Sequence, residues 1–433
     1  MRIGLIGDNS VEFVNKLLHI WRKGNCAVVI DWRIPFKIAE KLLSDAGVSF
    51  CYIDSGIINF QQENALLAGI NYIPYSSEKG TTLLPKEIVH KYQPNYTKDE
   101  ALILFSSGTT GANKGIILSF SAINNNADSV KKYMQLQRDD AIYIVKSLAH
   151  SSTIVGELLV GLKTHCNIYI SSTIVPPQYT LNNIERLKIT TIALNPSMIS
   201  LYCKAEAVKA HDYSKLKAVY TSGSKLDSCL IKEFRRTFNS VPLLNVYGLT
   251  EAGPRVTAQT LANQCTDYSV GKAIDGVSIR IDSTAYNCKE YGEICVKTKA
   301  LCSGYISGSP LRISDDGWLH TGDLGYIDKN ENLYVVGRVD NMVIVGSHNV
   351  FPEDVEKTIL SSGLVFECIV YSKKDLINGM VLMCDYIAET DLHTELKTYC
   401  DIYLAPYEIP RNFNKVAQIP KTYNGKKRRN HCG

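Results

Sequence analysis

Helical segments alternate with short runs of β-branched and other apolar residues over the first half of the chain. Apolar residues at Phe13 and Leu17 recur at helical spacing, and residues 27–30 follow as a continuous apolar run. The same pair of patterns returns at residues 38–43 and 48–53. Strands that read as unbroken apolar runs are typical of parallel sheets covered by helices on both faces. The alternation therefore predicts the α/β fold class, with a large N-terminal domain of stacked βαβ sheets.

This patterning continues through the middle of the chain. We expect strands at residues 102–105, 116–117, 166–170, 190–194, 219–221 and 243–247. Thr180 is expected to cap a helix that reaches Leu187, and Asn195 with Pro196 forms an N-cap and first-turn pair for the next helix. Residues 74–100 are polar and weakly periodic, so we expect a loop there.

The texture of the sequence changes near residue 270, where shorter strands with glycine turns indicate a β-rich subdomain. We expect strands at residues 277–281, 292–296, 332–336 and 365–370, and a helix over residues 396–403. Pro352 is expected to open another helix, with Val355 and Ile359 facing inward. We therefore predict two domains, residues 1–339 and a small α+β domain of residues 340–433.

Composition excludes several classes of function. The 433 residues are 45% hydrophobic and 21% charged, as in ordinary globular proteins. The net charge is +4, and the basic cluster Lys426 to Arg429 is too small to indicate a nucleic-acid partner. Thirteen cysteines show neither CxxC pairs nor zinc-ligand spacing. No stretch is long enough for a membrane span and MRIGLIGDNS is no signal peptide, so we expect a cytoplasmic protein.

The stretch from Leu102 to Leu118, LILFSSGTTGANKGIIL, places glycines and hydroxyl side chains directly after an apolar strand. Glycines permit φ > 0 and let backbone N–H groups point to one side. With the hydroxyl donors and a lysine, this chemistry suits a polyphosphate, although a flexible polar surface loop is the alternative. No Ser or Thr follows the lysine, so it is not a Walker loop. The candidate phosphate-binding residues are Ser106, Ser107, Gly108, Thr109, Thr110, Gly111 and Lys114.

Later motifs offer further groups that could bind a nucleotide. In NVYGLTE, Tyr247 offers a flat face for a base and Glu251 a hard oxygen ligand for Mg²⁺; the alternative is a core tyrosine with a solvated glutamate. In HTGD, Asp323 can accept hydrogen bonds from two ribose hydroxyls, or simply shape a turn. Arg338 has a permanent charge, with a surface salt bridge as its alternative. Lys426 in PKTYNGK taken alone fits a basic tail better than a catalytic role.

Taken together and in this order, the motifs resemble those of the adenylate-forming superfamily, which includes acyl-CoA synthetases, peptide-synthetase adenylation domains and firefly-type luciferases. SSGTTGANKG is similar to its phosphate-loop signature, and NVYGLTE, HTGDLGYID, GRVDNMVIVG and PKTYNGK are similar to its later signatures. The resemblance covers essentially the whole chain. It departs in an N-terminus that starts almost at the first strand, and in residues 343–345, which lack a lysine that many members carry.

The resemblance implies a two-step reaction. A carboxylate attacks the α-phosphorus of ATP, giving acyl-AMP and pyrophosphate, and a thiol then takes the acyl group. Thr250 and Glu251 would hold the α-phosphate and Mg²⁺, and Tyr247 would stack on adenine. Lys426 would bridge the carboxylate and the α-phosphate. The other residues assigned to the nucleotide, besides the phosphate-binding stretch, are Ser222, Gly223, Ser224, Asn245, Gly248, Asp323 and Arg338.

The resemblance also implies a mobile C-terminal domain that changes position between the two steps. Asp340 matches its hinge, and Gly346 matches the backbone that lines the thiol tunnel. His150, with Ser151 and Gly248, matches the acyl pocket, although a satisfied core histidine is the alternative.

The residues that follow His150 bear on which acid is the substrate. No carboxylate stands there before Glu157 to pair with the α-ammonium group of an amino acid, and an unpaired cation is costly in a desolvated site. We therefore expect an aliphatic or aryl acid. The chain has no carrier domain, so the thiol belongs to CoA or to the phosphopantetheine of a separate acyl carrier protein. A stand-alone enzyme that loads a carrier and a non-catalytic nucleotide-binding homologue remain alternative functions.

Overall fold

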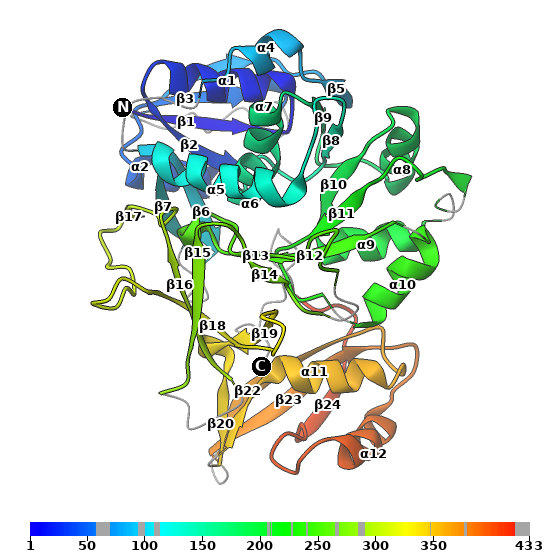
Figure 1. Ribbon diagram of the computed structural model, residues 1–433. Helices are drawn as coiled ribbons and strands as arrows, with labels where there is room; N and C mark the ends of the chain where they lie inside the picture. Colours follow the sequence, from blue (N-terminus) through cyan, green and yellow to red (C-terminus); the bar gives the residue numbers. More distant parts are fainter. Residues whose placement is uncertain are drawn as a thin grey trace. The chain divides into compact units, whose positions relative to one another are not determined.

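The computed structural model describes residues 1–57, 70–93, 100–107, 113–205, 208, 210–226, 228–239, 241–264, 268–284, 291–346, 348–375 and 379–420 (Figure 1). The chain divides into two compact units. The first comprises Met1–Arg280, Cys295–Thr321 and Asp328–Leu333, and the second comprises Ile281–Ile294, Gly322–Ile327 and Tyr334–Gly433. The domain boundary expected at residues 339 and 340 stays a prediction. No helix in the described ranges has the length and apolar character needed to cross a membrane.

One sheet of the first unit has seven strands in the order β17-β7-β6-β2-β1-β3-β4. Their bounds are β1 (Arg2–Gly7), β2 (Cys26–Asp31), β3 (Phe50–Asp54), β4 (Asn71–Tyr75), β6 (Glu100–Ser107), β7 (Asn113–Ser119) and β17 (Gly304–Tyr305). Strands β6, β2, β1, β3 and β4 run parallel; at one edge β7 pairs antiparallel with β6, and β17 pairs antiparallel with β7. Every residue of β2, CAVVID, is buried, as expected for a central parallel strand.

Helices α1 (Val11–Arg22) and α2 (Phe36–Asp45) confirm the two helices expected before residue 50. The Ser10 side chain caps α1 by accepting a hydrogen bond from the N–H of Phe13. The apolar face of α1 is buried in the core that it shares with this sheet. Trp21 Nε1 donates to the carbonyl of Ala101 at 2.7 Å, which ties the helix to β6.

The glycine-and-hydroxyl stretch lies between two antiparallel strands. Ser106 pairs with Lys114, and Ser107 with Asn113, at the ends of β6 and β7. The described strands therefore form the two arms of a hairpin, whereas a Walker loop connects a strand to a helix. Gly108, Thr109, Thr110 and Gly111 lie outside the described residues.

A second sheet of the first unit has eight strands in the order β14-β13-β12-β11-β10-β8-β9-β5. Their bounds are β5 (Thr81–Leu83), β8 (Ala141–Ile144), β9 (Asn167–Ser171), β10 (Thr191–Leu194), β11 (Ala218–Thr221), β12 (Leu243–Tyr247), β13 (Thr257–Ala258) and β14 (Lys272–Ala273). The five strands from β12 to β9 in this order are parallel. Strands β9, β10, β11 and β12 match apolar runs read from the sequence, β8 was not predicted, and the expected α/β fold class is confirmed.

Helical segments connect successive strands of the second sheet, and α4 and α5 lie on the connections between the two sheets. They are α4 (Lys86–His90), α5 (Phe120–Met134), α6 (Ser151–Thr153), the π-helix η1 (Ile154–Leu159), α7 (Val160–Thr164), α8 (Pro177–Arg186), α9 (Pro196–Cys203), α10 (Ser228–Phe238) and the 3₁₀ turn η3 (Thr250–Ala252). Asn195 caps α9 by accepting from the N–H of Met198 at 2.8 Å, and Pro196 opens it, so that expectation is confirmed.

Two local expectations were wrong. Residues 74–100 contain β5 and α4 as well as the end of β4, because scattered apolar residues such as Leu84 and Val89 are buried without any periodic pattern. Thr180 does not cap α8, which begins at Pro177; it is fully buried inside the helix. In both places tertiary burial determined the structure more strongly than the local pattern did.

The chain then forms a four-stranded sheet in the order β15-β16-β18-β19, with bounds Val277–Asp282, Gly292–Thr298, Leu319–Ile327 and Leu333–Arg338. The second unit continues with η4 (Val339–Asn341), β20 (Val343–Val345), β21 (His348–Val350), α11 (Pro352–Ser361), β22 (Glu367–Asp375), β23 (Gly379–Ile387), α12 (His393–Tyr403) and β24 (Asn412–Lys415). Val355 and Ile359 of α11 are buried in the core of this unit, as expected.

Candidate active site

A tight turn follows β12, at the carboxyl end of the parallel strands. Tyr247 is the last residue of the strand, and η3 begins three residues later. A Cβ at Gly248 would overlap the carbonyl oxygen of Pro254, so only glycine allows the two backbone segments to approach this closely. Open α/β sheets bind ligands at this edge. The turn therefore presents Thr250 and Glu251 where the sequence analysis expected a nucleotide.

Two predicted site residues from distant segments meet at this turn. The hydroxyl oxygens of Ser151 and Thr250 lie 2.8 Å apart, and either can donate. His150 precedes α6 and is half-buried. His150 lies near Asp31. Burial raises the pKa of the Asp31 carboxyl, but Arg33 and, to a smaller extent, His150 lower it, so the net shift is downward. The structure thus brings the predicted acyl-pocket segment beside the predicted phosphate-binding threonine.

Glu251 is held by a tyrosine that the sequence analysis missed. The hydroxyl of Tyr305 donates to Oε1 of Glu251 at 3.1 Å, and Nζ of Lys114 lies 5.6 Å from the centroid of the same ring. Tyr305 belongs to β17, which pairs with β7 next to Lys114. Tyr305 thus contacts a carboxylate, a group that suits Mg²⁺, and lies near an ammonium group, which suits the phosphates of ATP.

Other predicted nucleotide residues lie on neighbouring loops of the first unit. Ser222, Gly223 and Ser224 follow β11, the parallel neighbour of β12, so both loops leave the sheet at the same edge. Asn245 is buried, and its side-chain amide donates to the carbonyl oxygens of Ser269 and Tyr268 at 3.1 and 3.3 Å. These bonds give Asn245 a structural role, and its contact with the nucleotide stays a prediction.

The second unit places two predicted nucleotide-binding residues together. Asp323 is 8% exposed, and Nη1 of Arg338 donates to its Oδ1 at 3.0 Å. The other guanidinium nitrogen of Arg338 lies 3.7 Å from Oδ2 of Asp340, the predicted hinge residue. The N–H of Gly322, where φ is 76°, donates to Glu293 at 2.8 Å and holds the turn that presents Asp323. Arg338 therefore orients the predicted ribose-binding carboxylate.

The remaining predicted residues are described in part. Gly346 is exposed with φ at 63°, a backbone conformation that favours glycine. Lys426 lies outside the described residues, as do Gly108 to Gly111. For Ser106 and Ser107 the backbone is described and the side chains are not. The roles of these residues stay predictions.

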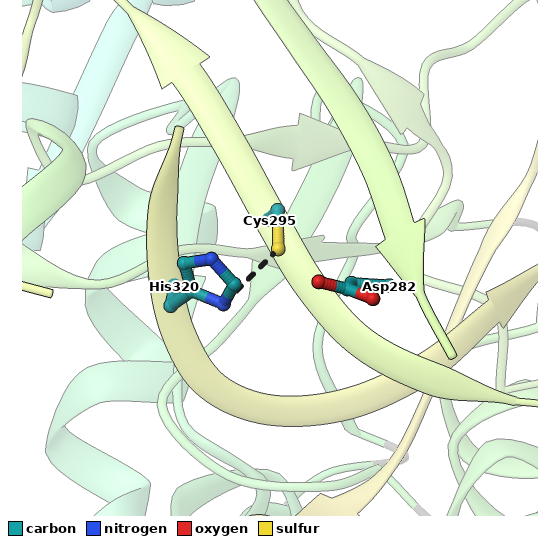
Figure 2. Close-up of side chains that lie close together, drawn as sticks. All are labelled: Asp282, Cys295 and His320. Carbon is teal, nitrogen blue, oxygen red and sulfur yellow. Dashed lines mark hydrogen bonds between the residues drawn. The ribbon is translucent and has the colours of Figure 1, made fainter. Parts of the chain in front are cut away.

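A thiol–imidazole contact lies beside the predicted ribose motif (Figure 2). Sγ of Cys295 in β16 is 3.5 Å from Nδ1 of His320 in β18. The third side chain drawn, Asp282, accepts hydrogen bonds from the N–H and the hydroxyl of Thr284 at 3.1 and 2.6 Å. Each of the three side chains has a hydrogen-bond partner within the fold, and we assign all three a structural role.

Three buried charged residues of the first unit were not identified from the sequence as a group. Nζ of Lys146 lies 3.0 Å from Oε1 of Glu157, and both side chains are buried with Arg255. Burial raises the pKa of Glu157 and lowers that of Lys146, while their mutual attraction opposes both shifts. Of this group, only Arg255 could have been noticed from the sequence, because it stands directly after the Thr250 motif in EAGPR.

Comparison with known proteins supports the assignment of the motifs. Residues 1–306 match the family described as AMP-binding enzyme, and residues 354–426 match the AMP-binding enzyme C-terminal domain. A 2-succinylbenzoate–CoA ligase from Bacillus licheniformis is 28% identical over 343 residues, covering 76% of this chain and 68% of that protein. A 4-coumarate–CoA ligase from Vanilla planifolia is 27% identical over 461 residues, covering 98% and 82% respectively.

Among solved structures, the o-succinylbenzoate coenzyme A synthetase from Bacillus subtilis, in complex with ATP and magnesium ion, has a TM-score of 0.83 at 24% identity. The similarity covers 99% of this chain and 88% of that chain, and it shows a shared fold. The expected resemblance to adenylate-forming enzymes is thereby confirmed. Because the first family match spans residues 1–306 of 433, this chain belongs to the AMP-binding enzyme family.

Proposed function

We propose that this chain is an AMP-forming acid–thiol ligase of the acyl-CoA synthetase type, which activates a carboxylic acid with ATP and transfers the acyl group to CoA. The observation that carries the proposal is the grouping at the end of β12. Thr250 contacts Ser151, and Glu251 is held by Tyr305 beside Lys114. These residues place a hydroxyl, a carboxylate and a cation next to the acyl-pocket segment, which is the chemistry that adenylation needs.

The first step forms a bond between a carboxylate oxygen and the α-phosphorus of ATP, and breaks the bond to the pyrophosphate. Negative charge develops on the phosphoryl oxygens, so catalysis depends on positioning and on nearby positive charge. Lys114, with the glycine-and-hydroxyl stretch, would bind the departing phosphates. Thr250 would hold the α-phosphate, and Glu251 would ligate Mg²⁺. Lys426 would bridge the two reacting groups.

The base and the ribose of the nucleotide have predicted partners of their own. Tyr247 is half-buried at the end of β12, and its ring would stack on adenine. Ser222, Gly223 and Ser224 would form the wall beside it. Asp323, oriented by Arg338, would accept hydrogen bonds from the ribose hydroxyls. In the second step the thiol attacks the carbonyl carbon of acyl-AMP, releasing AMP, along a path that Gly346 would line.

The acid lacks an α-ammonium group in this proposal. Glu157 is the first carboxylate after His150, and it already pairs with Lys146. The neighbouring Arg255 would repel a second cation. This local charge supports an aliphatic or aryl acid as the substrate over an amino acid.

CoA is the proposed acceptor because the named relatives are CoA ligases. The phosphopantetheine of an acyl carrier protein offers the same thiol, and is the alternative acceptor in a biosynthetic pathway.

A pyrophosphate-release screen over carboxylic acids, with ATP and Mg²⁺, tests the function. We expect release that depends on a simple acid, and a CoA thioester when CoA is added to the best acid. Release without a CoA thioester, but with transfer to a phosphopantetheinylated carrier, would support the alternative acceptor. Faster exchange with amino acids would overturn the proposed substrate class, and no release with any acid would indicate a non-catalytic homologue.

A further inference from the structure

Two positive charges and one negative charge are buried together beside the acyl-pocket segment. Arg255, Lys146 and Glu157 are 3%, 8% and 1% exposed. Glu157 is paired with Lys146 at 3.0 Å, so it leaves the guanidinium of Arg255 without a carboxylate partner of its own. Burying an unpaired charge is costly, which makes such a group unusual unless a ligand completes it.

The hydrogen bonding of this group is also incomplete. Nε of Arg255 and Oε2 of Glu157 have no hydrogen-bond partner among the described residues, whereas Nζ of Lys146 and Oε1 of Glu157 face each other at 3.0 Å. One guanidinium nitrogen of Arg255 donates weakly to the carbonyl of Ser152 at 3.4 Å. Buried polar atoms in proteins are nearly always satisfied by protein or by bound molecules. The unsatisfied atoms therefore indicate a place for a polar ligand.

A cavity lies among these side chains. It is lined by Arg255, Glu157, Gly156, Tyr133 and Tyr220, and Thr191 with three apolar residues completes the wall; Lys146 does not line it. Gly156 makes room for the guanidinium, because a Cβ there would lie 2.9 Å from Nη2 of Arg255. The space suits about one water-sized group, so it fits the tip of a small chain better than a ring system.

The cavity lies close to the reacting centre. Arg255 contacts the carbonyl of Ser152, and the preceding residue, Ser151, contacts the hydroxyl of Thr250. Consecutive Cα atoms are about 3.8 Å apart, so the guanidinium and the Thr250 hydroxyl are separated by on the order of 10 Å. A chain of a few carbon atoms can span that distance.

We infer that the acid is a compact aliphatic acid with a second anionic group, whose charge pairs with Arg255 while the first carboxylate reacts at Thr250. This inference rests on the proposed function and narrows its substrate class. The added anion would bring the buried group to two positive and two negative charges. It would also accept hydrogen bonds from the guanidinium, for which Arg is well suited.

The test compares matched acids of three to six carbons, each straight-chain monocarboxylic acid against the α,ω-dicarboxylic acid of the same length. The readout is kcat/KM for acid-dependent pyrophosphate release by the full chain. We expect the wild type to prefer the best dicarboxylic acid by roughly 100-fold or more, because a site built to pair with a polar group rejects analogues that lack it.

Arg255→Met keeps the length of the side chain and removes its charge. We expect the dicarboxylic-to-monocarboxylic ratio of kcat/KM to fall by about 100-fold in this variant, and Arg255→Lys to retain part of the preference. Arg280→Met is the matched control, since Arg280 is a partly exposed arginine paired with Asp316, and it should keep the wild-type ratio.

The wild-type comparison decides the inference even if Arg255→Met fails to fold. Equal or better use of monocarboxylic acids by the wild type would overturn the second anion and leave the proposed ligase intact. A wild-type preference that persists in Arg255→Met would overturn the role of Arg255. Absence of pyrophosphate release with every acid would overturn the proposed function and this inference together.

Discussion

Glu251 shows how a single residue acquires a chemical role from its neighbours. The hydroxyl of Tyr305 donates a hydrogen bond to the Glu251 carboxylate, and this bond orients the carboxylate before a ligand binds. The partner stands 54 residues further along the chain, so the motif around Glu251 predicted the ligand group but not what holds it. A preoriented oxygen ligand is what a catalytic Mg²⁺ site requires.

Glu251→Gln should lower acid-dependent pyrophosphate release by about 100-fold or more and raise the Mg²⁺ concentration that gives half-maximal rate. The amide can still accept from Tyr305, but it lacks the charge that binds the ion. Titration of the rate with Mg²⁺ measures both effects. Glu331→Gln, at an exposed carboxylate paired with Lys272, is the control and should behave as wild type. An unchanged Mg²⁺ dependence in Glu251→Gln would contradict the assigned role.

At the scale of elements, close backbone approaches and strand-to-strand ion pairs set the geometry of the first unit. The turn after β12 packs on the segment that carries Arg255, and Gly248 makes this possible. Elsewhere Arg2, at the start of β1, forms two hydrogen bonds of 2.8 and 2.7 Å with Glu100, at the start of β6. Each feature gives a prediction about stability.

Gly248→Ala should lower the free energy of unfolding by about 1–3 kcal/mol, because its Cβ would overlap backbone that cannot move as a side chain can. Urea unfolding followed by circular dichroism measures the change. Gly56→Ala is the control, since a Cβ there would meet only Oδ1 of Asp54 at an ordinary 3.5 Å. Equal stability of the two variants would show that the turn tolerates a side chain.

The Arg2–Glu100 pair predicts a pH dependence. The hydrogen bond from Arg2 lowers the pKa of Glu100 in the folded protein. The ion pair therefore stabilises the fold above the unfolded pKa of about 4.3, and this stabilisation is lost as the pH falls through the lower folded pKa. Both side chains are about one-third exposed, which limits the effect to about 1 kcal/mol. Glu100→Gln should therefore destabilise the protein at pH 7 and match wild type near pH 3.

Unfolding in urea at both pH values measures this difference. Glu87→Gln, at an exposed position of α4, is the control and should show no comparable pH-dependent difference. A Glu100→Gln effect of the same size at pH 7 and pH 3 would mean that the charge of Glu100 contributes nothing through Arg2.

At the scale of the whole molecule, the predicted site residues are divided between the two units. Lys114, Thr250 and Glu251 belong to the first unit, and Asp323 and Arg338 to the second. The family resemblance implies that the C-terminal domain moves between the two half-reactions. We propose Asp340 as the hinge for that movement.

Lys426→Ala should abolish formation of acyl-AMP and leave thioester formation from pre-made acyl-AMP largely intact. The lysine charge is needed where the α-phosphoryl oxygens gain charge, and the second step does not build that charge. Pyrophosphate release measures the first half-reaction, and thioester formation from synthetic acyl-AMP measures the second. Lys415→Ala, an exposed lysine of β24, is the control. Equal loss of both half-reactions would contradict the assigned role.

The sequence by itself determined the features that depend on neighbours along the chain. The alternation of patterns predicted the α/β class, the Asn195–Pro196 pair predicted the start of α9, and the ordered motifs predicted the family. Capping, periodicity and motif chemistry act over a few residues, so they can be read without a fold.

Only the tertiary structure decided which distant residues meet. Ser151 and Thr250 are 99 residues apart, and their contact follows from how the sheet stacks its strands. Arg255, Lys146 and Glu157 come from three segments, and their shared burial has no local signature. Strand β5 and helix α4, within residues 81–90, were not predicted, because burial against other segments stabilises them. Long-range packing sums many weak contacts, and the chain order of residues does not reveal which contacts will form.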